Sequence, residues 1–135
     1  MNVSSSSGGR LPRDAALGRP VRDVMRLDPK TLAANATVGE ARAFFAGSAR
    51  MALLVDGATF VAALTRGDIP DAAGDEAAAV EFGRSDVEWV GPDVLTDEIV
   101  EALEAATERR IVVLGADRTL AGLLCLNRSG TEFCR

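Results

Sequence analysis

Apolar positions after residue 35 change from a helical to an extended spacing. Four of them recur three or four residues apart: Val38, Ala41, Phe44 and Phe45. This spacing predicts an amphipathic helix that begins after Thr37 and ends near Gly47. The apolar runs 51–55 and 59–64 flank the turn-forming pair Asp56-Gly57 and predict an antiparallel hairpin. The first half therefore predicts the order helix, strand, turn, strand.

The second half shows the same order. The spacing predicts a helix over 97–109, capped by Thr96, with Arg109 and Arg110 at its electronegative end. Apolar runs at 111–114 and 119–126 predict a second hairpin. Between the halves, the Ala-rich and acidic stretch 71–82 predicts a short closing helix, and Trp89 is expected to fill the core.

The similarity of the halves predicts an internal duplication. A shift of 59 residues (96 − 37) places Thr37 on Thr96, and one extra turn residue then places Thr65 on Cys125. Each copy is a helix with a few strands and one apolar face, too small for independent stability. We expect the copies to pack sheet against sheet about a pseudo-two-fold axis.

Composition narrows the function. The chain has 135 residues, of which 47% are hydrophobic and only 4% aromatic, which is typical of a globular protein with an aliphatic core. Its net charge of −5 disfavours nucleic acid and anionic membrane as partners. The sequence contains no His, the usual general base and metal ligand. We therefore predict no catalytic residue and no metal site.

The first residues and the cysteines bear on the cellular location and on the redox state of the protein. Residues 1–18 begin Ser/Gly-rich, lack an apolar signal segment and predict a flexible leader. No window approaches the ~20 apolar residues of a membrane span, so we expect a cytoplasmic protein. Cys125 and Cys134 are too few and too far apart for a zinc site or a vicinal dithiol. We expect both to be reduced thiols.

Two motifs of the first half resemble those of a CBS domain: Val21-Arg-Asp-Val-Met25 and Ala-Leu-Thr65-Arg-Gly-Asp68-Ile69. The second half resembles another, so that the resemblance covers about residues 21–130 as a tandem pair, or Bateman module. It implies an α/β (α+β) fold of two β-α-β-β-α repeats packed sheet to sheet. The expected division is a leader over 1–18, repeat 1 over 19–83 and repeat 2 over 84–135, the last without a full closing helix.

The resemblance also implies a ligand. The cleft between paired CBS domains commonly holds AMP, ADP, ATP or another adenosyl compound. By similarity, the Thr65 hydroxyl would donate to phosphate and the Asp68 carboxylate would accept from the ribose hydroxyls. Arg66 and the helix start near Gly67 would add positive charge. The base would lie against Thr31, Leu32, Ala33, Met51 and Ala52. The structural alternative is that Thr65 and Asp68 are a strand end and a helix cap.

The second repeat departs from the motif, since Cys125 and Arg128 stand where the hydroxyl and the acid would be. A thiol donates poorly and a guanidinium cannot accept from ribose, so one nucleotide site is predicted. Arg128 would either reach a phosphate across the cleft or be a solvated tail residue. The short C-terminus is expected to leave an apolar patch that a homodimer would cover.

These features predict a regulatory adenine-nucleotide sensor that acts on an unidentified partner and is not an enzyme. It would require no cofactor. The alternative is a ligand-independent dimerisation or interaction scaffold whose nucleotide cleft is degenerate. An enzyme that uses Asp68 and Glu98 as acid and base is disfavoured, because neither a nucleophile nor a His accompanies them.

Overall fold

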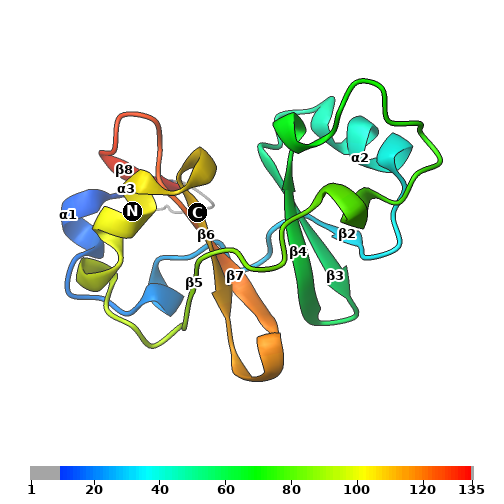
Figure 1. Ribbon diagram of the computed structural model, residues 1–135. Coiled ribbons are helices and arrows are strands. Elements are labelled where there is room, and N and C mark those ends of the chain that lie inside the picture. Colours follow the sequence, from blue (N-terminus) through cyan, green and yellow to red (C-terminus); the bar gives the residue numbers. More distant parts are fainter. Residues whose placement is uncertain (1–9, 135) are drawn as a thin grey trace, which may run out of the picture. The chain divides into compact units, whose positions relative to one another are not determined.

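Contacts along the chain define two units (Figure 1), and a computed structural model describes residues 10–134. Unit 1 contains the described parts of Met1–Pro29 and Ala121–Arg135 together with Glu88–Ala116. Unit 2 contains Lys30–Val87 and Asp117–Leu120. Each unit combines short helices with a three-stranded sheet, which confirms the predicted α/β class. None of the helices in residues 10–134 has the length and hydropathy to span a bilayer.

Unit 2 is built on the sheet β2-β3-β4, in which β2 is parallel and β4 antiparallel to β3. Its elements are β2 (Thr31–Ala33), α2 (Val38–Phe45), β3 (Met51–Asp56) and β4 (Thr59–Thr65). The predicted helix and hairpin are confirmed. α2 begins at a capping box, in which the Thr37 hydroxyl accepts from the Glu40 N–H at 3.1 Å and the Glu40 carboxylate accepts from the Thr37 N–H at 2.9 Å. The hairpin loop is Gly57-Ala58, one residue later than predicted, because Asp56 pairs with Thr59.

The predicted closing helix over 71–82 is wrong. In this region the chain forms irregular turns and a short 3₁₀ turn at Ala79–Phe82. Its backbone is paired elsewhere: Val38 N–H donates to the Ala77 carbonyl at 2.8 Å, and Ala79 N–H donates to the Ala36 carbonyl at 2.9 Å. These bonds tie the segment to the start of α2, so its peptide groups are not available to a helix of their own.

Unit 1 repeats this order of elements in the sheet β5-β6-β7, with β5 parallel to β6. Its elements are β5 (Trp89–Val90), α3 (Val100–Ala105), β6 (Arg110–Leu114) and β7 (Leu120–Cys125). α3 is shorter than predicted, because Ala106 has an extended backbone (φ −74°, ψ 155°) and ends the helical path. Glu108 and Arg109, with positive φ values of 55° and 52°, then keep the chain from resuming it before β6. Thr96 is buried, and its hydroxyl donates to the Arg19 carbonyl at 2.8 Å instead of capping a helix.

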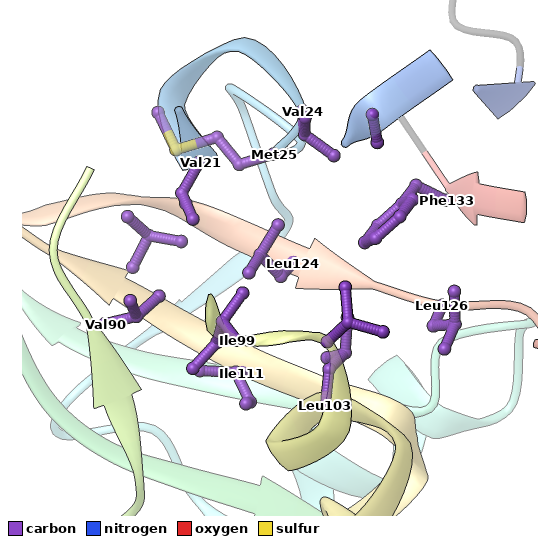
Figure 2. Close-up of a cluster of buried hydrophobic side chains, with 13 residues drawn as sticks. Val21, Val24, Met25, Val90, Ile99, Leu103, Ile111, Leu124, Leu126 and Phe133 are labelled. Atoms are coloured by element: carbon purple, nitrogen blue, oxygen red, sulfur yellow. The ribbon is translucent and has the colours of Figure 1, made fainter. Parts of the chain in front are cut away.

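The segment before residue 30 belongs to unit 1, although the predicted boundaries assigned residues 19–29 to the first repeat. Val21 N–H donates to the Val94 carbonyl at 2.8 Å, and Arg26 exchanges two backbone bonds with Leu123 at 2.9 and 3.1 Å. A Cβ at Gly122 would lie 2.6 Å from the Arg26 carbonyl, so only glycine allows this approach. Val21 lies in the buried core of unit 1 (Figure 2). The opening segment of the predicted first repeat therefore packs in unit 1, among the strands of the predicted second repeat.

The two ends of the described chain pair with each other in unit 1. β1 (Arg10–Pro12) is antiparallel to β8 (Glu132–Cys134), and α1 (Arg13–Ala16) follows β1. The prediction of a flexible leader over 1–18 is wrong from residue 10 onward, and residues 1–9 lie outside the described part. Phe133 is fully buried in the core (Figure 2). The C-terminal segment thus covers apolar surface that the sequence predicted to be open.

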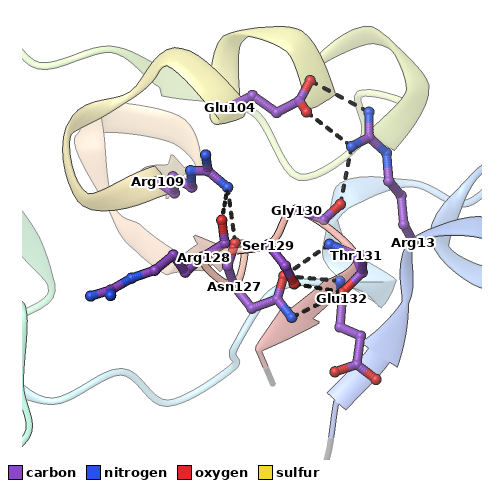
Figure 3. A network of polar contacts seen from close by, with 9 residues as sticks. All are labelled: Arg13, Glu104, Arg109, Asn127, Arg128, Ser129, Gly130, Thr131 and Glu132. Carbon is purple, nitrogen blue, oxygen red and sulfur yellow. Dashed lines mark hydrogen bonds and ion pairs between the residues drawn. The ribbon is translucent and has the colours of Figure 1, made fainter.

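Hydrogen bonds hold the turn that brings β8 back along β7 (Figure 3). The Asn127 side-chain oxygen accepts from the N–H groups of Thr131 and Glu132 at 2.9 and 3.2 Å. Arg109 donates to the Asn127 carbonyl at 3.2 Å. Arg13 donates to the Gly130 carbonyl at 3.1 Å and to Glu104 at 3.0 Å. The hydrogen bond from Arg13 lowers the pKa of the Glu104 carboxyl.

Unit 1 also carries large apolar side chains on its surface. These are Leu17, Leu27, Trp89 and Leu95. Trp89 is 52% exposed, so the prediction that it fills the core is wrong. Its strand β5 has only two residues and pairs with β6 alone.

We predict that Phe133→Ala lowers the free energy of unfolding by about 3–5 kcal/mol, because it leaves a cavity among side chains that close the core. Leu27→Ala is the control: Leu27 is 73% exposed, and its truncation should change stability by no more than about 0.5 kcal/mol. Urea unfolding of the two variants measures the difference. Equal effects would contradict the role of β8 in the core.

Candidate functional site

The predicted nucleotide residues of the first repeat lie at one end of the sheet β2-β3-β4. β2 and β3 start at this end and the antiparallel β4 finishes there. Met51 is the register partner of Thr65, and Thr31 is the partner of Leu53. The structure therefore brings segments 31–33, 51–52 and 65–68 together within unit 2.

Thr65 and Asp68 form a closed hydrogen-bonded pair. One Asp68 carboxylate oxygen accepts from the Thr65 N–H at 2.8 Å and from its hydroxyl at 2.9 Å. The other oxygen accepts from the Arg84 guanidinium at 2.9 Å. The Asp68 side chain is only 10% exposed, whereas that of Arg84 is 57% exposed. An ionised carboxylate offers about four lone-pair sites, and three are used here. The pair can therefore accept one further donor as it stands, and a second if Arg84 moves away.

Arg84 is a residue of this site that the sequence interpretation missed. Its backbone exchanges two hydrogen bonds with Ala63, with distances of 2.9 and 2.8 Å, and this places its side chain beside the end of β4. No spacing rule links Arg84 to Asp68, because Arg84 follows Asp68 by 16 positions along a mostly irregular segment. The one signal in the sequence is a basic residue directly after Gly83, where the first repeat was expected to end.

The residues expected to hold the base divide between the two faces of the sheet. The strand register places Thr31, Met51 and Thr65 on one face. Ala52 lies on the other face, fully buried in the cluster beneath α2, and the partly buried Leu32 packs against the same cluster. The side chain of Ala52 therefore has no surface to offer a ligand, and that of Leu32 has little.

The expected helix start at Gly67 is absent, because Arg66–Asp68 is a single 3₁₀ turn. Without a helix there is no macrodipole to attract a phosphate. Arg66 donates to the Phe45 carbonyl at the end of α2. It lines an open hollow of about 360 Å³ with Arg42, Phe45, Ala46, Ile69 and Asp71. Thr65 and Asp68 are not part of this hollow.

In the second repeat, Cys125 ends β7 and is buried, and Arg128 lies in the turn after it, in unit 1. The Arg128 side chain extends away from the polar network of that turn (Figure 3). Cys125 Sγ lies 2.6 Å from Cys134 Sγ, and both are free thiols. The prediction that these cysteines are too far apart for a dithiol is wrong, because the chain turns after β7 and brings Cys134 back beside Cys125.

The fold defines the class: a mixed α/β protein with two three-stranded sheets whose strands follow the same order. The family model of the CBS domain matches residues 21–74. The match is thus confined to the first half of the chain, while the described chain as a whole has the fold of a CBS-domain pair. No curated protein matches the chain.

Three solved structures illustrate the fold. The cystathionine beta-synthase pair domain of SO5017, a proposed Mg2+ transporter of Shewanella oneidensis MR-1, is 18% identical with a TM-score of 0.68, and the match covers 78% of this chain and 64% of that one. The CBS domain pair of MJ0100, in complex with 5′-methylthioadenosine and S-adenosyl-L-methionine, is 20% identical with a TM-score of 0.63, and the match covers 78% and 88%.

The third is the cytosolic domain of the Mg2+ channel MgtE in complex with ATP, which is 17% identical with a TM-score of 0.65. Its match covers 81% of this chain and 47% of that one. The chain thus spans less than two thirds of the length of two of these three structures. At such identities the likeness concerns the fold.

We predict that Asp68→Ala lowers the free energy of unfolding by about 1–2 kcal/mol, because the Thr65 N–H loses the acceptor that caps the turn. Arg84→Ala should cost about 1 kcal/mol or less, since the guanidinium is 57% exposed and Asp68 keeps both hydrogen bonds from Thr65. Urea unfolding without nucleotide measures both. A neutral Asp68→Ala would show that the carboxylate has no structural role.

Proposed function

We propose that the chain is a regulatory module that binds an adenine nucleotide, AMP, ADP or ATP, or a related adenosyl compound, inside the cell. Its occupied state would alter the association with an unidentified regulated protein. The observation that carries this proposal is the placement of Thr65 and Asp68 at the end of the sheet where the segments 31–33 and 51–52 also lie.

The chemistry of the pair suits a nucleoside. Asp68 can accept from a ribose hydroxyl, and Thr65, whose hydroxyl now donates to Asp68, can turn its donor to a phosphate once ribose occupies the carboxylate. Arg84 would then be free to follow the phosphate, since its side chain is more than half exposed. Arg66 takes no part in this proposal, because it is bonded to α2.

Related folds support an adenosyl ligand. The MJ0100 pair is in complex with two adenosyl compounds, and the MgtE domain is in complex with ATP. CBS pairs are generally regulatory modules. We therefore propose that this chain binds its nucleotide without converting it chemically. Turnover of ATP by the purified chain would contradict this proposal.

The alternative is a scaffold that does not bind nucleotide. It is favoured by the hydrogen bonds between Thr65 and Asp68. They already pair the polar groups at the end of β4 and in the turn after it, so that no ligand is needed there. Ligand titration separates the two functions.

We predict that AMP, ADP, ATP or S-adenosylmethionine binds the purified chain at one site per chain, measured by calorimetry. Asp68→Asn should weaken binding by about 10-fold or more, since a charge-assisted bond to ribose is worth about 1.5–3 kcal/mol. The control is Asp56→Asn, an exposed carboxylate at the hairpin end of the same sheet, which should leave the affinity unchanged. Failure of every ligand to bind would leave the scaffold.

The same titration tests the suggested role of Arg128. If its guanidinium contacts a phosphate, Arg128→Ala should weaken AMP binding and reduce its dependence on salt, while adenosine binding stays the same. If Arg128→Ala and the wild type have the same AMP affinity at low salt and also at high salt, Arg128 is a solvated residue with no role in binding.

We further propose a homodimer, now on different grounds. Phe133 is buried, so the C-terminal segment does not leave the apolar patch that was expected there. Other apolar side chains of unit 1 are exposed instead: Leu27 at 73%, Trp89 at 52% and Leu95 at 44%. A dimer that joins these side chains into one contact would remove them from water, as happens to contiguous apolar patches at association surfaces. Light scattering should give twice the chain mass, and Trp89→Ser should shift it towards the monomer. A wild-type monomer at high concentration would contradict the proposal.

A further inference from the structure

The two cysteines of the chain meet across an antiparallel turn. Leu126 pairs with Phe133, and Asn127 N–H donates to the Glu132 carbonyl at 2.9 Å. One step outward in the same register, Cys125 lies opposite Cys134, with the sulfur atoms 2.6 Å apart. Side chains directly opposite in such a pair have Cβ atoms about 4.5–5.5 Å apart, close to the separation that a disulfide needs.

The backbone on both sides of this pair is held in place. The Asn127 side chain and Arg109 fix the turn, and Arg13 binds the Gly130 carbonyl (Figure 3). Beyond the turn, β8 is paired with β1, and Phe133 is fully buried. The thiols therefore remain opposite each other because the surrounding structure holds both strands.

The environments of the two thiols differ. Cys125 is 4% exposed, whereas Cys134 is partly exposed. The Cys125 S–H donates to Cys134, and this bond lowers the pKa of Cys134 to about 6, with Arg110, Arg10 and Arg26 adding to the effect. The same bond and burial raise the pKa of Cys125.

The charged groups near the pair favour the thiolate of Cys134. The three arginines come from β6, β1 and the segment that pairs with β7, while Glu132 lies 3.7 Å from Arg10 and offsets part of its charge. The accessible sulfur is therefore the nucleophile, and the buried one is placed to complete a second step.

We propose that Cys125 and Cys134 are a reversible dithiol–disulfide pair, oxidised by low-molecular-weight disulfides, that joins the end of β7 to β8. Cys125 occupies the position in the second repeat that Thr65 occupies in the first, so the second copy carries a thiol where the first carries a hydroxyl. This inference does not depend on nucleotide binding.

The reaction proceeds by two exchanges. The Cys134 thiolate, whose proton has passed to solvent, attacks one sulfur of the small disulfide R–S–S–R. This forms Cys134–S–S–R and releases R–S⁻, which takes up a proton from solvent. The Cys125 sulfur then attacks Cys134 Sγ, its proton passes to the leaving R–S⁻, and the Cys125–Cys134 bond forms. Two thiols lose two electrons in total, and R–S–S–R is reduced to two R–SH.

The experiment incubates the purified full chain in buffers of graded reduced and oxidised glutathione, quenches it with acid and blocks free thiols with a maleimide. Intact mass should show a monomer that loses both reactive thiols together, and peptide mapping should place the bond between Cys125 and Cys134. The oxidised chain should melt at a temperature higher by roughly 5 °C or more, and reduction should reverse this.

Two variants separate the pair from general thiol chemistry. Cys134→Ser should leave Cys125 slow to react, because it is buried and has lost its thiolate partner. Cys125→Ala should leave Cys134 as a mixed disulfide with glutathione, and the pH of half-maximal alkylation should rise from about 6 towards that of an ordinary thiol. Two thiols that stay reactive under strongly oxidising conditions, or disulfides only between chains, would overturn the proposal.

Discussion

The sheet of unit 1 and its short helix α3 do not close a core by themselves, and this constraint governs the rest of the structure. The sheet β5-β6-β7 and the six-residue helix α3 leave apolar surface that must be covered from elsewhere. Two segments distant in sequence provide the cover: the opening segment with Val21 and Val24, and the closing strand with Phe133. Burial of this apolar area offsets the entropic cost of ordering both ends of the chain.

The way this core is completed has consequences beyond stability. Because the opening segment lies on β7, Gly122 must remain without a side chain, and the first unit in space is not the first in sequence. Because β8 returns along β7, two cysteines that are separated by a turn meet at their sulfur atoms. The redox pair is thus a consequence of how the C-terminus is anchored.

The first repeat combines structure and candidate function in one pair of residues. Asp68 caps the turn after β4 and carries the carboxylate that a ribose would need. The Arg84 guanidinium pairs with that carboxylate, but it is 57% exposed, and ion pairs with an exposed partner contribute little. A ligand could therefore displace Arg84 at small cost, whereas the bonds to Thr65 must be kept or replaced.

The local pattern of the sequence determined the elements whose interactions are short-range. The α2 helix follows from the spacing of Val38, Ala41 and Phe45, and the β3-β4 hairpin from two apolar runs around Gly57, because periodicity and turn chemistry act over a few residues. The pairing of Thr65 with Asp68 could also be predicted from the sequence, because the two residues are only three positions apart. Only the tertiary structure decided which unit the opening segment joins, that Arg84 reaches Asp68, that 71–82 is not a helix, and that Cys125 meets Cys134. Each of these depends on backbone pairing or core burial between residues distant in sequence, which no local pattern records.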